Sequence, residues 1–207
     1  MKRALDQFEE NFSRIRDLDN VTKSFSKLTT SAIDISDILR AEIVLTVSAL
    51  DHFVHELVRL AMLEIAGGTR SPTDAFDRFS ISIKDVKIGA NTHPSLTWFD
   101  NLVREKHLWL SFQHPDKIAD ALRLITNQPL WDSVATQINK RRTKNRVTAK
   151  DIKTTLRLIV DRRNKIAHEA DMDPTAPGTR WAIAHLDVVH TMKFVKTIAR
   201  AMFQIAK

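Results

Sequence analysis

Apolar residues recur at helical spacing along most of the chain. The first such stripe covers residues 2–18 and predicts an amphipathic helix. Its members are Leu5, Phe8, Phe12, Ile15 and Leu18. Residues 31–66 form the longest helical segment, and from Ala41 to Leu50 it is apolar around most of its circumference. We therefore expect this segment at the centre of a helical bundle.

Local signals mark where the main helices begin and end. Gly67-Gly68 ends the central segment, as glycine commonly does after a helix. Thr148-Ala149-Lys150-Asp151 is a capping box that opens a helix to about residue 171. These patterns predict an all-α fold, a single helical domain over residues 1–207. Its core helices cover about 31–66, 148–171 and 183–205, and a more irregular insert covers about 67–147.

The insert carries several further helix signals. Ser71-Pro72-Thr73-Asp74 resembles the start of a helix, and prolines at 94, 115 and 129 are well placed to begin three more. Those three are expected to end near residues 110, 125 and 138. Apolar and polar residues alternate from Ile81 to Ile88, so a short strand is an alternative there. We favour a short helix or loop.

Composition narrows the class of protein. The chain has 207 residues, no cysteine, and a net charge of +7. Disulfides, a thiol nucleophile and cysteine-based zinc sites are thereby excluded. The first ten residues lack the apolar run of a signal peptide, and charged residues interrupt the apolar stretch 38–65, so we expect a cytoplasmic protein with no membrane partner. The basic balance favours polyanionic partners, nucleic acid first, although ordinary solubility charge is the simpler alternative.

One arginine breaks the apolar pattern of the helix that begins at Thr148. At 100° per residue, the apolar stripe of this helix comprises Ile152, Leu156, Ile159, Val160, Ile166, Ala167 and Ala170. Arg163 falls near the middle of that stripe. A guanidinium facing an apolar surface is costly unless it is paired or used. It either pairs with a buried acid such as Asp51 on the central helix or serves a functional site.

A polar face lies on the other side of the same helix. Its residues are Arg157, Asp161, Asn164, His168 and Asp171. Arg163 and His168 are five residues apart, which places them about 140° apart on an ideal helix. One straight helix therefore cannot easily aim both side chains at one atom. Either the helix distorts near His168, or two copies of the helix form the site in a symmetric dimer.

Two segments together resemble a known family. Residues 160–169 read Val-Asp-Arg-Arg-Asn-Lys-Ile-Ala-His-Glu, which is similar to the Arg-x(4–6)-His motif of the HEPN superfamily (higher eukaryotes and prokaryotes nucleotide-binding domain). Residues 39–51 resemble the central helix of its RiboL-PSP-like branch. The motif alone is short and degenerate, and the two segments together are more specific. The resemblance covers about residues 35–205.

The resemblance implies an HEPN-like α-helical bundle, commonly a homodimer, with both motifs lining a cleft between protomers. It implies a metal-independent endoribonuclease without cofactor, working in toxin–antitoxin, antiphage or RNA-processing systems, with an antitoxin or defence-system protein as a possible partner. RNA carries its own nucleophile in the 2′-hydroxyl, a histidine can move the proton, and an arginine can stabilise charge on phosphorus. His168 would be the acid–base residue and Arg163 the phosphate stabiliser. Asn164 would orient His168 or bind phosphate.

Further residues enter as supporting groups. Arg162 also fits the looser motif spacing but points to another face, so it ranks second as the motif arginine. Asp51 is expected to hold Arg163 in place. Asp161 belongs to the polar face of the helix. A basic run precedes the motif helix, and we expect it either to track an RNA backbone or to be a solvated loop. Its charged members are Lys140, Arg141, Arg142, Lys144 and Arg146.

No metal site is predicted, because His52 and His55 are followed by Glu56 in an order that differs from His-Glu-x-x-His. Two other functions stay open at this point. One is a catalytically silent helical module that senses nucleotide or RNA or docks a partner protein. The other is a DNA-associated accessory subunit, against which the chain offers no convincing helix-turn-helix signature.

Overall fold

The structure is a computed structural model that describes residues 1–28, 34–91, 96–140 and 142–207. Regular secondary structure within these ranges is entirely helical, apart from one isolated bridge between Met172 and Arg180. The predicted all-α fold class is therefore confirmed. Among the described helices, none combines the length and the apolar composition needed to cross a bilayer.

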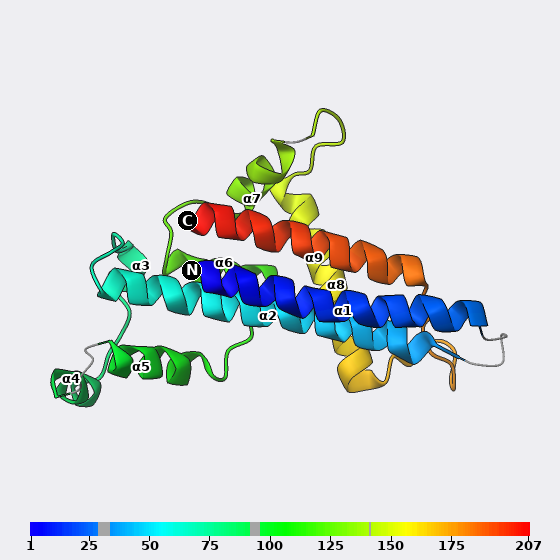
Figure 1. Ribbon diagram of the computed structural model, residues 1–207, viewed down its shortest axis with the longest axis horizontal. Helices are drawn as coiled ribbons and strands as arrows, with labels where there is room; N and C mark the ends of the chain where they lie inside the picture. The colour runs from blue at the N-terminus through cyan, green and yellow to red at the C-terminus, as the bar shows by residue number, and fades with distance from the viewer. Residues whose placement is uncertain (29–33, 92–95, 141) are drawn as a thin grey trace.

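The chain forms a succession of helices (Figure 1). In chain order they are α1 (Lys2–Leu28), α2 (Ser36–Ala66), α3 (Asp74–Asp77), α4 (Ile83–Ala90), α5 (Thr97–His107), α6 (Pro115–Arg123), α7 (Leu130–Asn139), α8 (Ala149–Glu169) and α9 (His185–Ala206). The long helices α2, α8 and α9 occupy the three ranges predicted for the core. The predicted first residues of the central helix, 31–33, lie outside the described residues.

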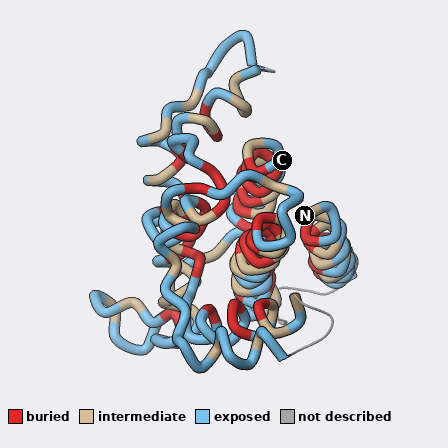
Figure 2. Tube along the Cα trace, turned by 90° about the vertical axis from the view of Figure 1, so that its left-hand side faces the viewer, coloured by how far each residue is buried: buried red, intermediate tan, exposed pale blue. Residues whose placement is uncertain are grey.

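Helix α2 is the centre of the bundle. It runs antiparallel to α1 and alongside α9, while α8 crosses behind it (Figure 1). Leu50, Phe53 and Leu57 of α2 are at most 1% exposed, as expected for a helix that is apolar around most of its surface. Buried residues concentrate on the inner faces of these helices, and the outer segments of the insert are exposed (Figure 2).

Helix α1 is longer than its apolar stripe predicts. Beyond Leu18 the buried positions are Asp19 and Thr22, which contact other helices through polar atoms. The Thr22 hydroxyl donates to Glu42 of α2 at 2.7 Å, and His185 of α9 lies 2.5 Å from Asp19. Burial removes the Glu42 carboxyl from water and so raises its pKa, while the hydrogen bond from Thr22 lowers the pKa in part. Hydrophobic periodicity misses this last part of α1 because polar pairs take the place of apolar ones.

The insert forms a helix in the segment from Ile81 to Ile88, where the sequence allowed a strand, a short helix or a loop. Helix α4 replaces the strand that alternation allowed, and a reciprocal capping box of Ser82 and Asp85 opens it. The helix expected to open at Ser71 begins later, at Asp74. Thr73 is its cap, because the Thr73 hydroxyl accepts from Phe76 N at 3.0 Å and donates to the carbonyl of Arg123 at 2.9 Å. The two prolines expected to start α6 and α7 lie at those starts, whereas Pro94 lies outside the described residues.

A buried histidine attaches α5 to α2. His107 is 5% exposed, and its ring lies 5.5 Å from that of Phe112 and 6.2 Å from that of His55. The His107 Nδ1 atom is buried and has no hydrogen-bond partner among the described residues. Burial, and secondarily the charge of His55, lowers the pKa of His107 from 6.5 to about 4. His107 is therefore neutral in the folded protein at neutral pH.

This depressed pKa predicts an acid-sensitive fold. Below about pH 6.5 His107 becomes protonated in the unfolded chain, whereas in the folded protein it stays neutral down to about pH 4. The free energy of unfolding therefore decreases as the pH falls from about 6.5 to about 4. We expect the free energy of unfolding, measured with urea at pH 7 and pH 5, to drop more for the wild type than for His107→Leu. His52→Leu, at an exposed position of α2, is the control and should keep the wild-type difference. Equal pH dependence in all three proteins would contradict this prediction.

Candidate active site at the end of helix α8

Helix α8 begins as predicted. Asp151 N donates to the Thr148 hydroxyl at 3.2 Å, and Thr148 N donates to the Asp151 carboxylate at 2.9 Å. These reciprocal bonds satisfy two backbone donors that have no partner within the helix. The first half of α8 then buries Ile152, Leu156 and Val160 in the main core. This half anchors the helix that carries the motif.

The second half of α8 departs from its predicted apolar stripe. Ile166 is half-buried against the small cluster of Leu39 and Ile43, whereas Ala167 and Ala170 are exposed. The prediction that these two alanines face the core is wrong. The reason is geometric: α8 crosses α2 instead of lying along it, so its C-terminal end extends past the core (Figure 1). The motif is therefore carried on a projecting helix end.

Arg163 is half-buried and its charge is not neutralised. Its Nη1 donates to Asn164 Oδ1 at 3.0 Å, and its buried Nε has no hydrogen-bond partner among the described residues. Every other described arginine that is at least half-buried has a carboxylate oxygen within 4.0 Å. These arginines are Arg40, Arg59, Arg70 and Arg162. Arg163 thus differs from them in keeping a guanidinium available for an external anion.

The expected partner of Arg163 is engaged elsewhere. The Asp51 carboxylate accepts from Phe112 N at 2.5 Å and from Gln113 Nε2 at 3.3 Å. It therefore fastens the segment before α6 to α2, and the expectation that it holds Arg163 is wrong. An acid on the apolar central helix is explained by these amide donors, which no sequence pattern revealed.

His168 lies in the last turn of α8 and is exposed. It has no hydrogen-bond or ion-pair partner in the described part of the chain, and the Asn164 amide oxygen is turned to Arg163 instead. Asp161 is also exposed. Helix α8 is continuous through Glu169, so a distortion that would bring His168 and Arg163 to one face is absent. The structure therefore does not show the helical distortion that one of the two geometric explanations requires.

The residues directly after the motif fold back into the protein. Ala170 and Asp171 have positive φ values of 51° and 58°, and this left-handed turn carries the Asp171 side chain inward. Asp171 is fully buried, so its expected place on the polar face beside His168 is wrong. Its Oδ2 accepts from Arg40 Nε at 2.7 Å and from Arg162 Nη2 at 2.8 Å. Two cations thus share one buried carboxylate.

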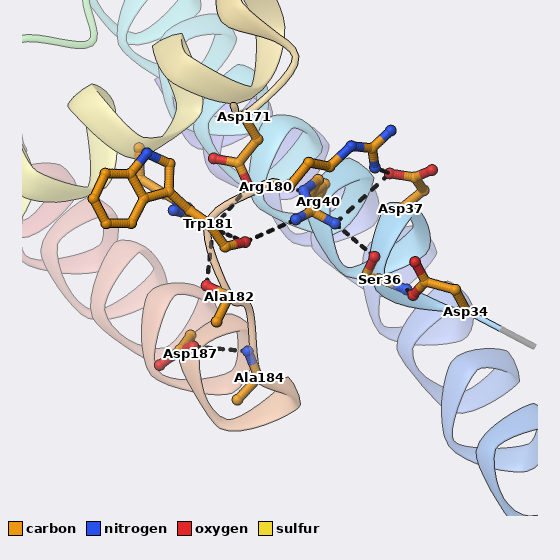
Figure 3. A network of polar contacts seen from close by, with 11 residues as sticks. Asp34, Ser36, Asp37, Arg40, Asp171, Arg180, Trp181, Ala182, Ala184 and Asp187 are labelled. Carbon is orange, nitrogen blue, oxygen red and sulfur yellow. Dashed lines mark hydrogen bonds and ion pairs between the residues drawn. The ribbon is translucent and has the colours of Figure 1, made fainter. Parts of the chain in front are cut away.

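This carboxylate is the centre of a network that joins three segments (Figure 3). Arg40 also donates to the Ser36 hydroxyl at 2.6 Å and to the Trp181 carbonyl at 2.8 Å. Arg162 reaches the Ala182 carbonyl at 3.1 Å. The start of α2, the end of α8 and the loop before α9 are thereby held together. Arg162, ranked second as a motif arginine, is a structural residue of this network.

The basic run lies at the opposite end of α8. Lys140, Arg142, Lys144 and Arg146 are exposed in the loop before this helix, and Arg141 lies outside the described residues. Eighteen residues separate Lys150, in the first turn, from His168, which is about 27 Å along a helix. Within one chain, the basic run and the motif therefore lie near opposite ends of α8. Among the described residues, no group of three His, Asp or Glu side chains is arranged to hold a metal ion.

The fold and the site define an α-helical bundle with an Arg-x4-His segment at a projecting helix end. A family model, RiboL-PSP-HEPN, matches residues 9–207. The chain belongs to this family, and HEPN membership points to a nuclease-type or RNA-related function. No curated protein and no solved structure matches the chain.

Breaking the network at its buried carboxylate is expected to destabilise the protein strongly. Asp171→Asn removes the buried counter-charge of Arg40, whose side chain is 7% exposed, and leaves it only the exposed Asp37 carboxylate at 3.7 Å among the described residues. Losing one partner of a buried ion pair typically costs about 3–5 kcal/mol, so we expect a loss of that size in urea denaturation. Glu169→Gln, an exposed change two residues away, should cost less than about 0.5 kcal/mol. Similar stability of both variants would show that the network contributes little.

Proposed function

We propose that this protein is a metal-independent endoribonuclease. The observation that carries the proposal is Arg163: a half-buried guanidinium without a carboxylate partner among the described residues, on the same helix as an exposed histidine. Keeping such a charge unneutralised is unfavourable unless an anion binds to it. The phosphate groups of RNA are anions of the right kind. Membership of the RiboL-PSP-HEPN family supports the same reading.

The proposed reaction uses groups already present in RNA and protein. The 2′-hydroxyl attacks the adjacent phosphorus while His168 takes its proton, and the bond from phosphorus to the 5′-oxygen breaks. The 5′-oxygen takes a proton from water as it leaves and His168 returns its proton to the solvent, which gives a 2′,3′-cyclic phosphate and a 5′-hydroxyl. Arg163 stabilises the added negative charge on the pentacoordinate phosphorus. Asn164, which accepts a hydrogen bond from Arg163 at 3.0 Å, orients the guanidinium for this task.

The complete site is proposed to form between two protomers. Arg163 is turned partly inward and His168 outward on a continuous helix, so a second copy is the simplest way to bring one of each together. A partly apolar surface suited to such contact lies nearby. A hollow beside Arg162, between α8 and α9, is lined by Leu158, Ile159 and Phe194, and Leu158 is 65% exposed. Burying this surface in a homodimer would stabilise the assembly.

The cellular role we propose is a toxin–antitoxin or antiphage defence system in the cytoplasm. This assignment rests on the family and not on the geometry of the site. In such a system an antitoxin or another defence protein is the natural partner. The exposed position of His168 makes the motif directly accessible to RNA and to an inhibitor alike.

The first test is cleavage of total cellular RNA in the presence of a chelator. We expect the wild type to cleave RNA with or without EDTA and to leave 2′,3′-cyclic phosphate ends. His168→Ala should lower the cleavage rate about 10²- to 10⁴-fold, the range for loss of a general acid–base group. His52→Ala, an exposed histidine on α2, is the matched control and should cleave normally. Full activity of His168→Ala would disprove its role, and an inactive wild type would favour a silent RNA-sensing module.

A mixing experiment tests whether the site is shared between protomers. Arg163→Ala and His168→Ala proteins are expected to be inactive separately. Co-refolding or co-expression of the two should restore cleavage, because one of the two sites in a mixed dimer then combines intact Arg163 with intact His168. If each protomer used its own Arg163 and His168, every site in the mixture would lack one group. No recovery of activity in a mixture that forms dimers would therefore overturn the shared site.

A further inference from the structure

A second positively charged region lies away from the motif. A cleft of about 780 Å³ opens where α6, α7 and the first turn of α8 meet. Cations from three separate parts of the chain line it: Arg78 after α3, Arg123 at the end of α6, and Lys150 and Lys153 on α8. Their convergence is a product of the fold, because no sequence run contains all four.

Three of these four cations form no ion pair with the described residues. Arg78, Lys150 and Lys153 have no ion-pair partner in the described part of the chain, whereas Arg123 pairs with Asp120 at 2.5 Å. Two acids also line the cleft, Asp74 and Asp132. With Arg123 already paired, three unpaired cations face two anions, which leaves the lining positive, and in a cleft such a potential is focused on an incoming anion.

The cleft continues along α7 toward the basic run. A second hollow of about 410 Å³ shares Gln128, Pro129 and Asp132 with the first and reaches Lys140. Between these points its lining is mainly polar, with Ser133, Thr136, Gln137 and Gln204. We call the two hollows together the α7 groove. Lys140, at its far end, is the first residue of the basic run, so cations lie at both ends of the groove.

We propose that the α7 groove binds the phosphate backbone of single-stranded RNA. Lysine, arginine, amide and hydroxyl side chains are the groups that contact phosphate and sugar. The one aromatic residue of the lining, Trp131, is 7% exposed and its indole N–H donates to the Pro115 carbonyl at 3.1 Å. No indole face is therefore free for base stacking, and binding in the groove is independent of base sequence. The choice of RNA among polyanions rests on the ribonuclease proposed above.

The position of the groove gives it a distinct role. Lys150 lies about 27 Å from His168 along α8, so the groove holds RNA far from the bond that is cut within the same protomer. An RNA long enough to contact both regions gains affinity from the second contact, and a very short RNA does not. The groove thus favours long single strands over short fragments.

The test measures the salt dependence of RNA binding in the catalytically impaired His168→Ala background. Binding of a fluorescent 30-nucleotide RNA without secondary structure is followed by anisotropy at several salt concentrations. The triple change Arg78→Gln, Lys150→Gln and Lys153→Gln should weaken binding and lower the slope of log K against log salt by up to about 2, since each phosphate contact to a single strand contributes about 0.7. Homopolymers of different bases should be affected alike.

The matched control removes the same charge elsewhere. Lys27→Gln, Lys84→Gln and Lys87→Gln change exposed residues of α1 and α4, outside the groove, and should leave the slope as it is. Circular dichroism and thermal melting verify that both triple variants fold. An unchanged slope in the groove variant, or an equal decrease in the control, would contradict the proposal that the α7 groove binds RNA. RNA cleavage is measured separately, on the protein with intact His168. Absence of RNA binding in the groove and absence of ribonuclease activity are therefore distinguished by different measurements.

Discussion

The end of the motif helix depends on one buried carboxylate. Asp171 is fully buried and accepts hydrogen bonds from Arg40 and Arg162, and Arg40 in turn binds the loop before α9. A charge in this position is tolerable only because two guanidiniums neutralise it, so each of the three segments requires the others. The left-handed turn at Ala170 and Asp171 ends α8 at this point and leaves His168 in its last turn.

Two neighbouring arginines of the motif have opposite roles because of this network. Arg162 donates its hydrogen bonds to Asp171 and to backbone carbonyls, whereas in the described part of the chain Arg163 donates only to the Asn164 amide. One side chain is therefore structural and the other is available to a ligand. A helix turns by about 100° per residue, so adjacent positions necessarily face different surroundings. This difference separates the candidate phosphate ligand from its neighbour more clearly than the motif spacing does.

Helix α8 also separates two kinds of surface. Its first turn faces the α7 groove, where Lys150 and Lys153 meet cations from the insert, and its last turn carries the proposed catalytic histidine. Because a helix is a rigid spacer, the distance between these surfaces is set by its length. The insert between α2 and α8 thus does more than connect core helices, since it builds most of the positive groove.

Local periodicity, caps and short motifs were sufficient to predict the all-α class, the three long helices α2, α8 and α9, the capping box of α8 and the family. The sequence also marked Arg163 as unusual from its place on an apolar stripe. Three features became visible only in the folded protein: Asp51 binds other partners, Asp171 is buried with Arg40, and distant cations converge on one groove. Each of these depends on residues far apart in the chain, whose meeting is set by how the helices cross, and no local pattern encodes that crossing.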